Sequence, residues 1–301
     1  MFRRLVSIVL LMFTTATWSL PLQLIATLPV FAQIATDIGG EHVQVILLSD
    51  YSADPHYFNL TPKQLHQLFA ADYIIGPVEI VQRLPINSEH LIDVSKAYNN
   101  SAISSKALNR LIHIAQDHEP HDHEHTHDAG CSCHHHTANN PLLSLTHEWL
   151  SFDAIELLAK LLTEAYIRAD DAHRDFYEQR YLTMIQGLED LKKIYLNKEL
   201  KKKSIFYHND CWILEQELHT DFGPALYACD ESGLSPQLKQ LLERQSSQYQ
   251  ALIIDRSIPL QSLERITRLI ECPIIGIDTL GSPTPLSTIE WLDGILKVIY
   301  S

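Results

Sequence analysis

The chain has 301 residues, and 46% of them are hydrophobic, which is enough for two modest lobes with real cores. Its formal net charge of -14 disfavours nucleic acid or an anionic membrane surface as a partner and suits a cation. The odd number of cysteines leaves at least one thiol outside any intramolecular disulfide, and their pairing stays open. The cysteines are Cys131, Cys133, Cys211, Cys229 and Cys272.

The first nineteen residues differ in kind from the rest of the chain. A basic start with Arg3 and Arg4 is followed by the apolar run Leu5 to Phe13 and by small and polar residues up to Ser19. This pattern predicts a secretory signal peptide over residues 1–19, cleaved near its end; an uncleaved membrane anchor is the alternative. No cysteine precedes Cys131, so we expect a soluble periplasmic protein and not a lipoprotein.

The first half of the mature chain alternates short apolar runs with helical patterns. Alternation of this kind predicts βαβ units around a mainly parallel sheet. Strands are expected at 22–26, 42–48, 73–76 and 91–94, with helices at 30–38 and from Pro62 onward, where Thr61-Pro62 is typical of a helix start.

The second half contains two long helical patterns and then the same alternation again. Helices are expected at about 152–169 and, after an N-cap at Asp170-Asp171, over a further stretch of roughly 25 residues, about 40 Å long. Strands are expected at 204–208, 225–229, 252–255 and 274–277, with helices near 212–218, 236–245, 260–270 and 287–299.

The predicted architecture is therefore two four-stranded α/β lobes joined by one long, rigid linking helix. We expect an N-terminal lobe over 20–169, a linking helix over 170–200 and a C-terminal lobe over 201–301. A histidine-rich loop is expected over 117–137, inside the first lobe.

This loop is the densest group of metal ligands in the sequence. Imidazole and thiolate are the ligands that borderline-soft ions such as Zn²⁺ prefer. Few apolar residues and no fixed ligand spacing predict a low-affinity accessory region; a solvated polar insertion is the alternative. Its ligand candidates are His118, His121, His123, His125, His127, Cys131, Cys133, His134, His135 and His136.

Four residues outside the loop are candidates for a tighter site: His56, His147, His208 and Asp278. Three of them follow or close predicted strands, and ligands in open α/β sheets bind beyond the carboxyl ends of strands. Three imidazoles and one carboxylate make a tetrahedral set suited to Zn²⁺. Taken singly, each is as well explained as a solvated histidine, a helix cap or a turn residue.

Four motifs in this order resemble one family. They are Asp54-Pro55-His56 with Thr61-Pro62, His147-x-Trp149-Leu150, His208 after an apolar strand, and Asp278-x-Leu280-Gly281. Together they look like the periplasmic zinc- and manganese-binding proteins of metal ABC importers, the cluster A-I solute-binding family of the zinc, ZnuA-like type. The resemblance covers essentially the whole mature chain; the residues flanking the first, second and fourth motifs depart from the usual pattern.

The resemblance implies that His56, His147, His208 and Asp278 hold one metal ion in a cleft between the lobes, and that an integral-membrane permease is the partner of a monomeric protein. Manganese members usually have a second carboxylate where this chain has His208, so we predict zinc, with manganese as the alternative. A periplasmic zinc buffer or chaperone uses the same residues. A zinc hydrolase is disfavoured because Ser151 breaks the HExxH pattern that starts at His147.

Overall fold

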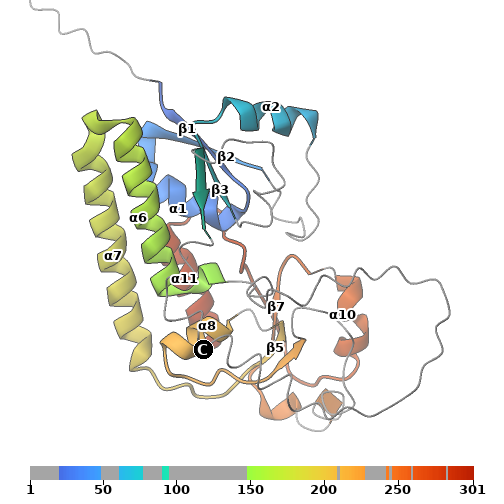
Figure 1. Ribbon diagram of the computed structural model, residues 1–301. Helices are drawn as coiled ribbons and strands as arrows, with labels where there is room; N and C mark the ends of the chain where they lie inside the picture. Colours follow the sequence, from blue (N-terminus) through green and yellow to red (C-terminus); the bar gives the residue numbers. More distant parts are fainter. Residues whose placement is uncertain are drawn as a thin grey trace, which may run out of the picture.

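The computed structural model describes residues 20–48, 61–76, 90–94, 148–208, 211–227, 242–243, 246–258, 260–282 and 284–301 (Figure 1). The predicted signal peptide, the histidine-rich loop and the candidate ligands His56 and His147 lie outside these residues. His208 and Asp278 lie within them.

A four-stranded parallel sheet forms the centre of the N-terminal lobe. Its strands are β1 (Leu22–Ala26), β2 (Val43–Leu47), β3 (Tyr73–Gly76) and β4 (Leu91–Asp93), in the order β2-β1-β3-β4. Leu24 of β1 is in register with Val45 and Tyr73 of its two neighbours. All pairings are parallel, so the four carboxyl ends lie along the same edge of the sheet.

Local sequence signals explain where the helices of this lobe begin and end. Helix α1 (Pro29–Gly39) starts with proline at its first position, and Gly40 follows it with φ of +52° at the start of the 3-10 turn η1 (Gly40–His42). Helix α2 (Pro62–Ala70) starts with the expected Thr61-Pro62 pair, and Thr61 and Gln64 form a reciprocal capping box.

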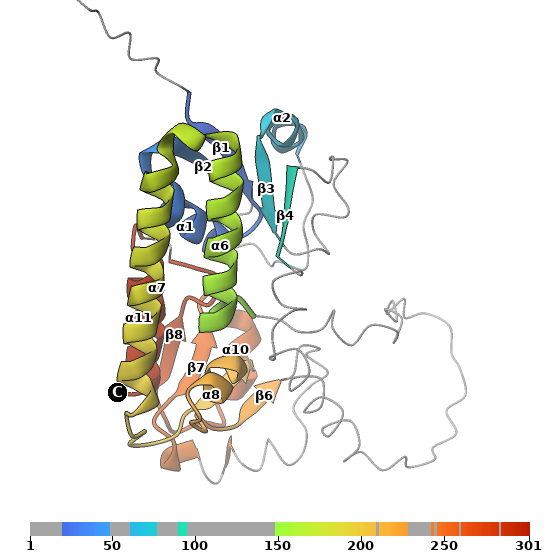
Figure 2. The same cartoon turned by 60° about the vertical axis from the view of Figure 1, so that its left-hand side comes forward.

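Two long helices form one side of the molecule. After the short turn η4 (Glu148–Leu150) come α6 (Phe152–Ala169), the 3-10 turn η5 (Asp171–His173) and α7 (Arg174–Leu196). Helix α7 contacts α6 and α1 in the N-terminal lobe and α11 (Thr288–Ile299) in the C-terminal lobe, and it runs beside both lobes in Figure 2.

The C-terminal lobe repeats the arrangement of the first. Its parallel strands are β5 (Ile205–His208), β6 (Ala225–Tyr227), β7 (Leu252–Asp255) and β8 (Ile274–Ile277), in the order β6-β5-β7-β8. The helical elements are α8 (Trp212–Glu217), η6 (Ser246–Gln248), α10 (Leu260–Thr267) and α11. The helix expected at 236–245 falls almost wholly outside the described residues.

These elements confirm the predicted fold class: two four-stranded parallel sheets flanked by helices, with one long helix between the lobes. The largest core cluster extends through both lobes, from Leu24 and Phe31 to Leu292 and Ile295. Cys272 is a buried free thiol, and Cys211 is buried. In the part of the chain that the structure describes, no helix combines the length and apolar character needed to cross a membrane.

Candidate metal site

Both described ligand candidates lie at the carboxyl edge of the C-terminal sheet. His208 is the last residue of β5, and Asp278 directly follows β8. Strand β7 lies between these two strands and ends at Asp255. Neighbouring strands are about 4.8 Å apart, so the backbones of β5 and β8 are separated by about 10 Å. A histidine and an aspartate side chain that extend from this edge can reach a common ion.

The position of His208 follows from strand alternation. Side chains two apart on a strand share a face, so His208 lies on the face of Phe206. Phe206 is buried in the core cluster that extends through both lobes, whereas Tyr207 packs in a separate cluster on the other face. The half-buried His208 thus belongs to the face that the C-terminal lobe shares with its neighbour.

Asp278 has a cationic partner. Its Oδ2 accepts a hydrogen bond from Arg256 Nη1 at 2.6 Å, and 24% of its side chain is exposed. Partial burial raises the pKa of Asp278 above its ordinary value, while Arg256 opposes that shift and Asp255 adds to it. A positive charge beside the Asp278 carboxylate is therefore favourable, and the Arg256 guanidinium supplies it.

A buried carboxylate fixes the turn that carries Asp278. Asp255 Oδ2 accepts hydrogen bonds from the Thr279 backbone N–H at 2.8 Å and from the Thr279 hydroxyl. Its other oxygen accepts from the Ser257 N–H at 2.7 Å. Because the two bonds from Thr279 have a charged acceptor, they hold the end of β7 and the turn after β8 as one unit, while the Ser257 bond fixes the Asp255 side chain.

Two tryptophans hold the same turn from different elements. Trp291 of α11 donates its indole N–H to the Asp278 carbonyl at 2.6 Å. Trp149 of η4 donates to the Thr279 carbonyl at 2.7 Å. Sequence reasoning singled out Trp149 as part of a motif and gave neither tryptophan a role. It also missed Asp255 and Arg256, although Asp255 is a carboxylate at a strand end.

The turn also meets the start of α1 in the N-terminal lobe. Gly281 has φ of +113°, and a Cβ there would lie 2.7 Å from the Val30 nitrogen. The next residue, Ser282, donates its N–H to Gln33 Oε1 of α1 at 3.0 Å. Helix α1 follows the carboxyl end of β1, so this contact brings the carboxyl edges of the two sheets toward each other.

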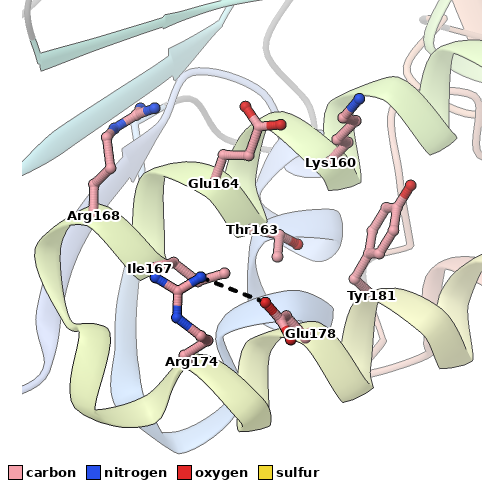
Figure 3. A pocket seen from close by; sticks show the side chains of 8 residues that line it. All are labelled: Lys160, Thr163, Glu164, Ile167, Arg168, Arg174, Glu178 and Tyr181. Carbon is pink, nitrogen blue, oxygen red and sulfur yellow. Dashed lines mark ion pairs between the residues drawn. The ribbon is translucent and has the colours of Figure 1, made fainter.

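A surface hollow lies elsewhere, between α6 and α7 (Figure 3). Its lining carries both signs of charge and includes an ion pair between Arg174 and Glu178 at 3.6 Å. It belongs to neither sheet edge and includes none of the predicted ligands. The candidate site is therefore the edge around His208 and Asp278, and not this hollow.

A family model described as "Zinc-uptake complex component A periplasmic" (ZnuA) matches residues 24–300. The chain belongs to the ZnuA family. Members of the ZnuA family are metal-binding solute-binding proteins of ABC importers and are not enzymes. The resemblance seen in the four motifs is thereby confirmed at the level of the family.

Solved structures share the fold of this ZnuA-family chain at low sequence identity. A crystal structure of ZnuA has 18% identity and a TM-score of 0.63, with 93% of this chain and 97% of that chain covered. The laminin-binding protein of Streptococcus agalactiae has 14% identity and a TM-score of 0.66, with 93% and 98% covered. FpvC from Pseudomonas aeruginosa, in complex with Mn²⁺, has 15% identity and a TM-score of 0.60, again with 93% and 98% covered. The search of curated proteins gave no match.

Proposed function

We propose that this protein captures Zn²⁺ between its two lobes in the periplasm and delivers it to an ABC-type membrane permease. His56 and His147 from the N-terminal lobe (20–169) and His208 and Asp278 from the C-terminal lobe (201–301) are the proposed ligands, with the linking helix (170–200) between them. Residues 1–19 serve as the signal peptide.

One contact supports this ligand set most directly, the hydrogen bond from Trp149 Nε1 to the Thr279 carbonyl at 2.7 Å. Trp149 is two residues after His147, and Thr279 is the residue after Asp278. The bond therefore joins two segments, one beside a proposed ligand of the N-terminal lobe and one beside a proposed ligand of the C-terminal lobe. A metal held by both segments would strengthen a connection that the protein chain already makes.

The choice of zinc rests on the chemistry of the donors. Three neutral imidazoles and one carboxylate favour a borderline ion, whereas an oxygen-rich set suits Mn²⁺. His208, at the end of β5, is the residue that makes this difference. Manganese is the second candidate, and FpvC in complex with Mn²⁺ is a structural neighbour with this fold.

Calorimetric titration of the mature protein with Zn²⁺ and Mn²⁺ tests the site and its preference. We expect one tight zinc site with affinity above that for Mn²⁺, and a loss of about a hundredfold or more in His208→Ala and Asp278→Asn. His66→Ala, on the exposed part of α2, is the matched control. Equal affinity in His208→Ala and His66→Ala, or a preference for Mn²⁺, would contradict the assignment.

The histidine-rich loop is proposed as an accessory region that gathers zinc at low affinity. A deletion of residues 118–136 should keep the tight site and lose only weakly bound zinc in the same titration. Loss of the tight site in this deletion would place the cargo in the loop. The import role is separated from a buffering role by growth in low zinc, because deletion of an import component should impair growth and excess zinc should restore it.

A further inference from the structure

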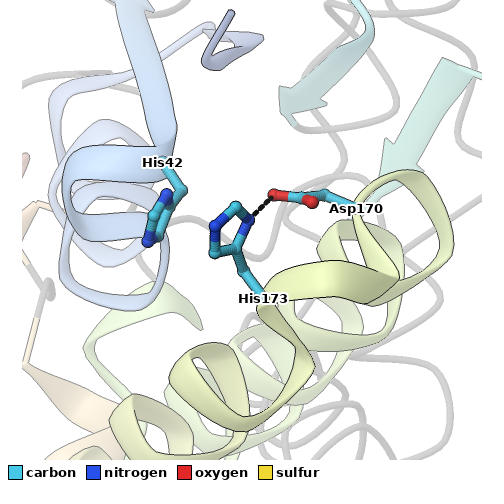
Figure 4. A group of neighbouring side chains, drawn as sticks. All are labelled: His42, Asp170 and His173. Carbon is cyan, nitrogen blue, oxygen red and sulfur yellow. Dashed lines mark hydrogen bonds and ion pairs between the residues drawn. The ribbon is translucent and has the colours of Figure 1, made fainter. Parts of the chain in front are cut away.

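A second group of possible metal ligands lies at the far end of the N-terminal lobe. It consists of His42, at the end of η1, with Asp170 and His173, at the connection between α6 and α7 (Figure 4). One ligand atom from each residue lies within 4.8 Å of the others, and all three residues are half-buried. His42 precedes β2, whose five residues span about 16 Å, so the group lies at the opposite end of this sheet from its carboxyl edge.

Asp170 fixes the orientation of His173. Its Oδ2 lies 2.7 Å from His173 Nδ1 and also accepts a hydrogen bond from the Tyr177 hydroxyl at 2.9 Å. A carboxylate can only accept, so Nδ1 carries the proton and Nε2 of a neutral ring carries the lone pair. Histidines that bind zinc show this pairing with a carboxylate on their second nitrogen.

The second ring nitrogen of His173 lies on the side of its ring toward His42 (Figure 4). The two imidazole rings are stacked with centroids 3.8 Å apart and planes 23° apart, and Phe176 packs edge-on against His42 at 4.6 Å. The neighbouring cation Arg174 is paired with Asp171 at 2.5 Å and not with Asp170. The carboxylate of Asp170 bonds to His173 and Tyr177. The three residues thus combine two imidazoles with one carboxylate, in a place where 36% of the His173 side chain is exposed.

We propose that His42 and His173, with Asp170 orienting His173, form a second and weaker site for Zn²⁺. Zinc–nitrogen bonds of about 2.0–2.1 Å place tetrahedral ligand atoms about 3.4 Å apart, so a turn of the His42 ring out of the stack is enough to form it. Water would complete the coordination from the exposed side. The ion would connect the start of β2 to the turn between α6 and α7, independently of the cargo site.

Carbethoxylation of histidines, read peptide by peptide by mass spectrometry on the full mature protein, tests this site separately from all others. We expect Zn²⁺ to protect His42 and His173 at one common half-saturating concentration, while His66 and His219 stay reactive. In His42→Gln, half-protection of His173 should require about tenfold more zinc, and His173→Gln should have the same effect on His42.

The two reciprocal variants guard against a folding defect, because each is read at the histidine that remains. His66→Gln is the matched control and should leave the protection of both residues unchanged. Equal labelling of His42 and His173 with and without Zn²⁺ would overturn the proposal. So would unchanged zinc protection of His173 in His42→Gln.

Discussion

If Asp278 binds a metal ion, its carboxylate interacts with two cations, the ion and the Arg256 guanidinium. Its Oδ2 lies 2.6 Å from Arg256 Nη1, and 61% of the Arg256 side chain is exposed. An incoming divalent ion would displace the guanidinium or share the carboxylate with it. Either event places a positive charge near the ion, so Arg256 should limit the affinity of the site and favour release of the cargo.

Replacing Arg256 with glutamine should therefore strengthen metal binding. We expect an increase in Zn²⁺ affinity of about tenfold, equivalent to about 1.4 kcal/mol, because a competing charge is removed beside the ligand. Calorimetry at neutral pH is the measurement, with Arg268→Gln as a control for the same change in net charge at an exposed position. A gain of equal size in both variants, or none in Arg256→Gln, would argue against competition.

The residues at the sheet edge show what sequence can and cannot reveal. His208 and Asp278 could be placed at strand ends because short apolar runs define where β5 and β8 stop. Their proximity to Arg256 and Trp291 could not be predicted from the sequence, because those contacts depend on how the strands and helices of one lobe pack. His56 and His147 lie outside the described residues, so their part in the site stays a prediction.

At the scale of elements, α8 caps the start of α6 from the other lobe. Glu217 accepts hydrogen bonds from the Ser151 hydroxyl at 2.6 Å and from the Phe152 and Asp153 N–H groups at 2.8 and 3.3 Å. Amino-terminal N–H groups of a helix need acceptors, and a carboxylate also suits the helix dipole. The lobes are thus joined by a charged cap as well as by apolar packing.

Removing this cap should destabilise the protein. Glu217→Ala leaves three donors without their carboxylate, and we expect the free energy of unfolding to fall by about 2 kcal/mol. Urea denaturation followed by circular dichroism measures it, and Glu199→Ala at an exposed site is the control. An equal, small loss in the two variants would show that Glu217 contributes little.

The pH dependence of stability should reflect two partly buried carboxyl groups, Glu217 and Asp37. Burial raises the pKa of Glu217, and it raises the pKa of Asp37, which accepts from the Thr288 N–H at 2.6 Å. Both groups have a higher pKa in the folded protein than in the unfolded chain. The stability that they contribute through their protonated forms is therefore full below pH 4 and is lost as pH rises through the folded pKa values.

Denaturation curves collected between pH 4 and pH 8 check that direction. Glu217→Gln should show a smaller loss of stability with rising pH than the parent protein, because one of the two raised groups is gone. Glu199→Gln, at an exposed position, should follow the parent curve. A steeper loss in Glu217→Gln would mean that ionised Glu217 is stabilised by its hydrogen bonds more than burial penalises it.

The helices also mark the limit of local sequence signals. Helix α6 has its expected bounds because its apolar spacing and the Ser151 cap agree. Helix α7 starts at Arg174, and no side-chain cap comes from Asp170 or Asp171. The carboxylate of Asp170 bonds to His173 and Tyr177 instead, and such a choice between partners depends on the packed structure.

At the scale of the whole molecule, α7 connects the lobes along its full length. Tyr177 is buried near its start, in the N-terminal lobe, and Tyr195 near its end donates a hydrogen bond to Asp293 Oδ1 of α11 at 2.8 Å. One core cluster continues from lobe to lobe beside it. Bending between the lobes would have to break these contacts, so large rotations are disfavoured.

Metal binding should accordingly change the overall shape very little. We expect the radius of gyration of the mature protein from small-angle X-ray scattering to differ by less than about 1 Å between the zinc-loaded and metal-free forms. Asp278→Asn with added zinc supplies the control for nonspecific effects of the ion. A decrease of several ångströms on loading would show a hinge closure that α7 does not prevent.

The two indole rings on the turn after β8 give the protein a built-in optical signal. The chain has four tryptophans, and Trp18 lies in the predicted signal peptide. Of the remaining three, Trp149 and Trp291 bond to the carbonyls of Thr279 and Asp278. An ion bound to the Asp278 carboxylate would polarise the same turn. Tryptophan emission should therefore follow occupancy of the metal site without an attached dye. The unlabelled protein would then work as a fluorescent zinc sensor.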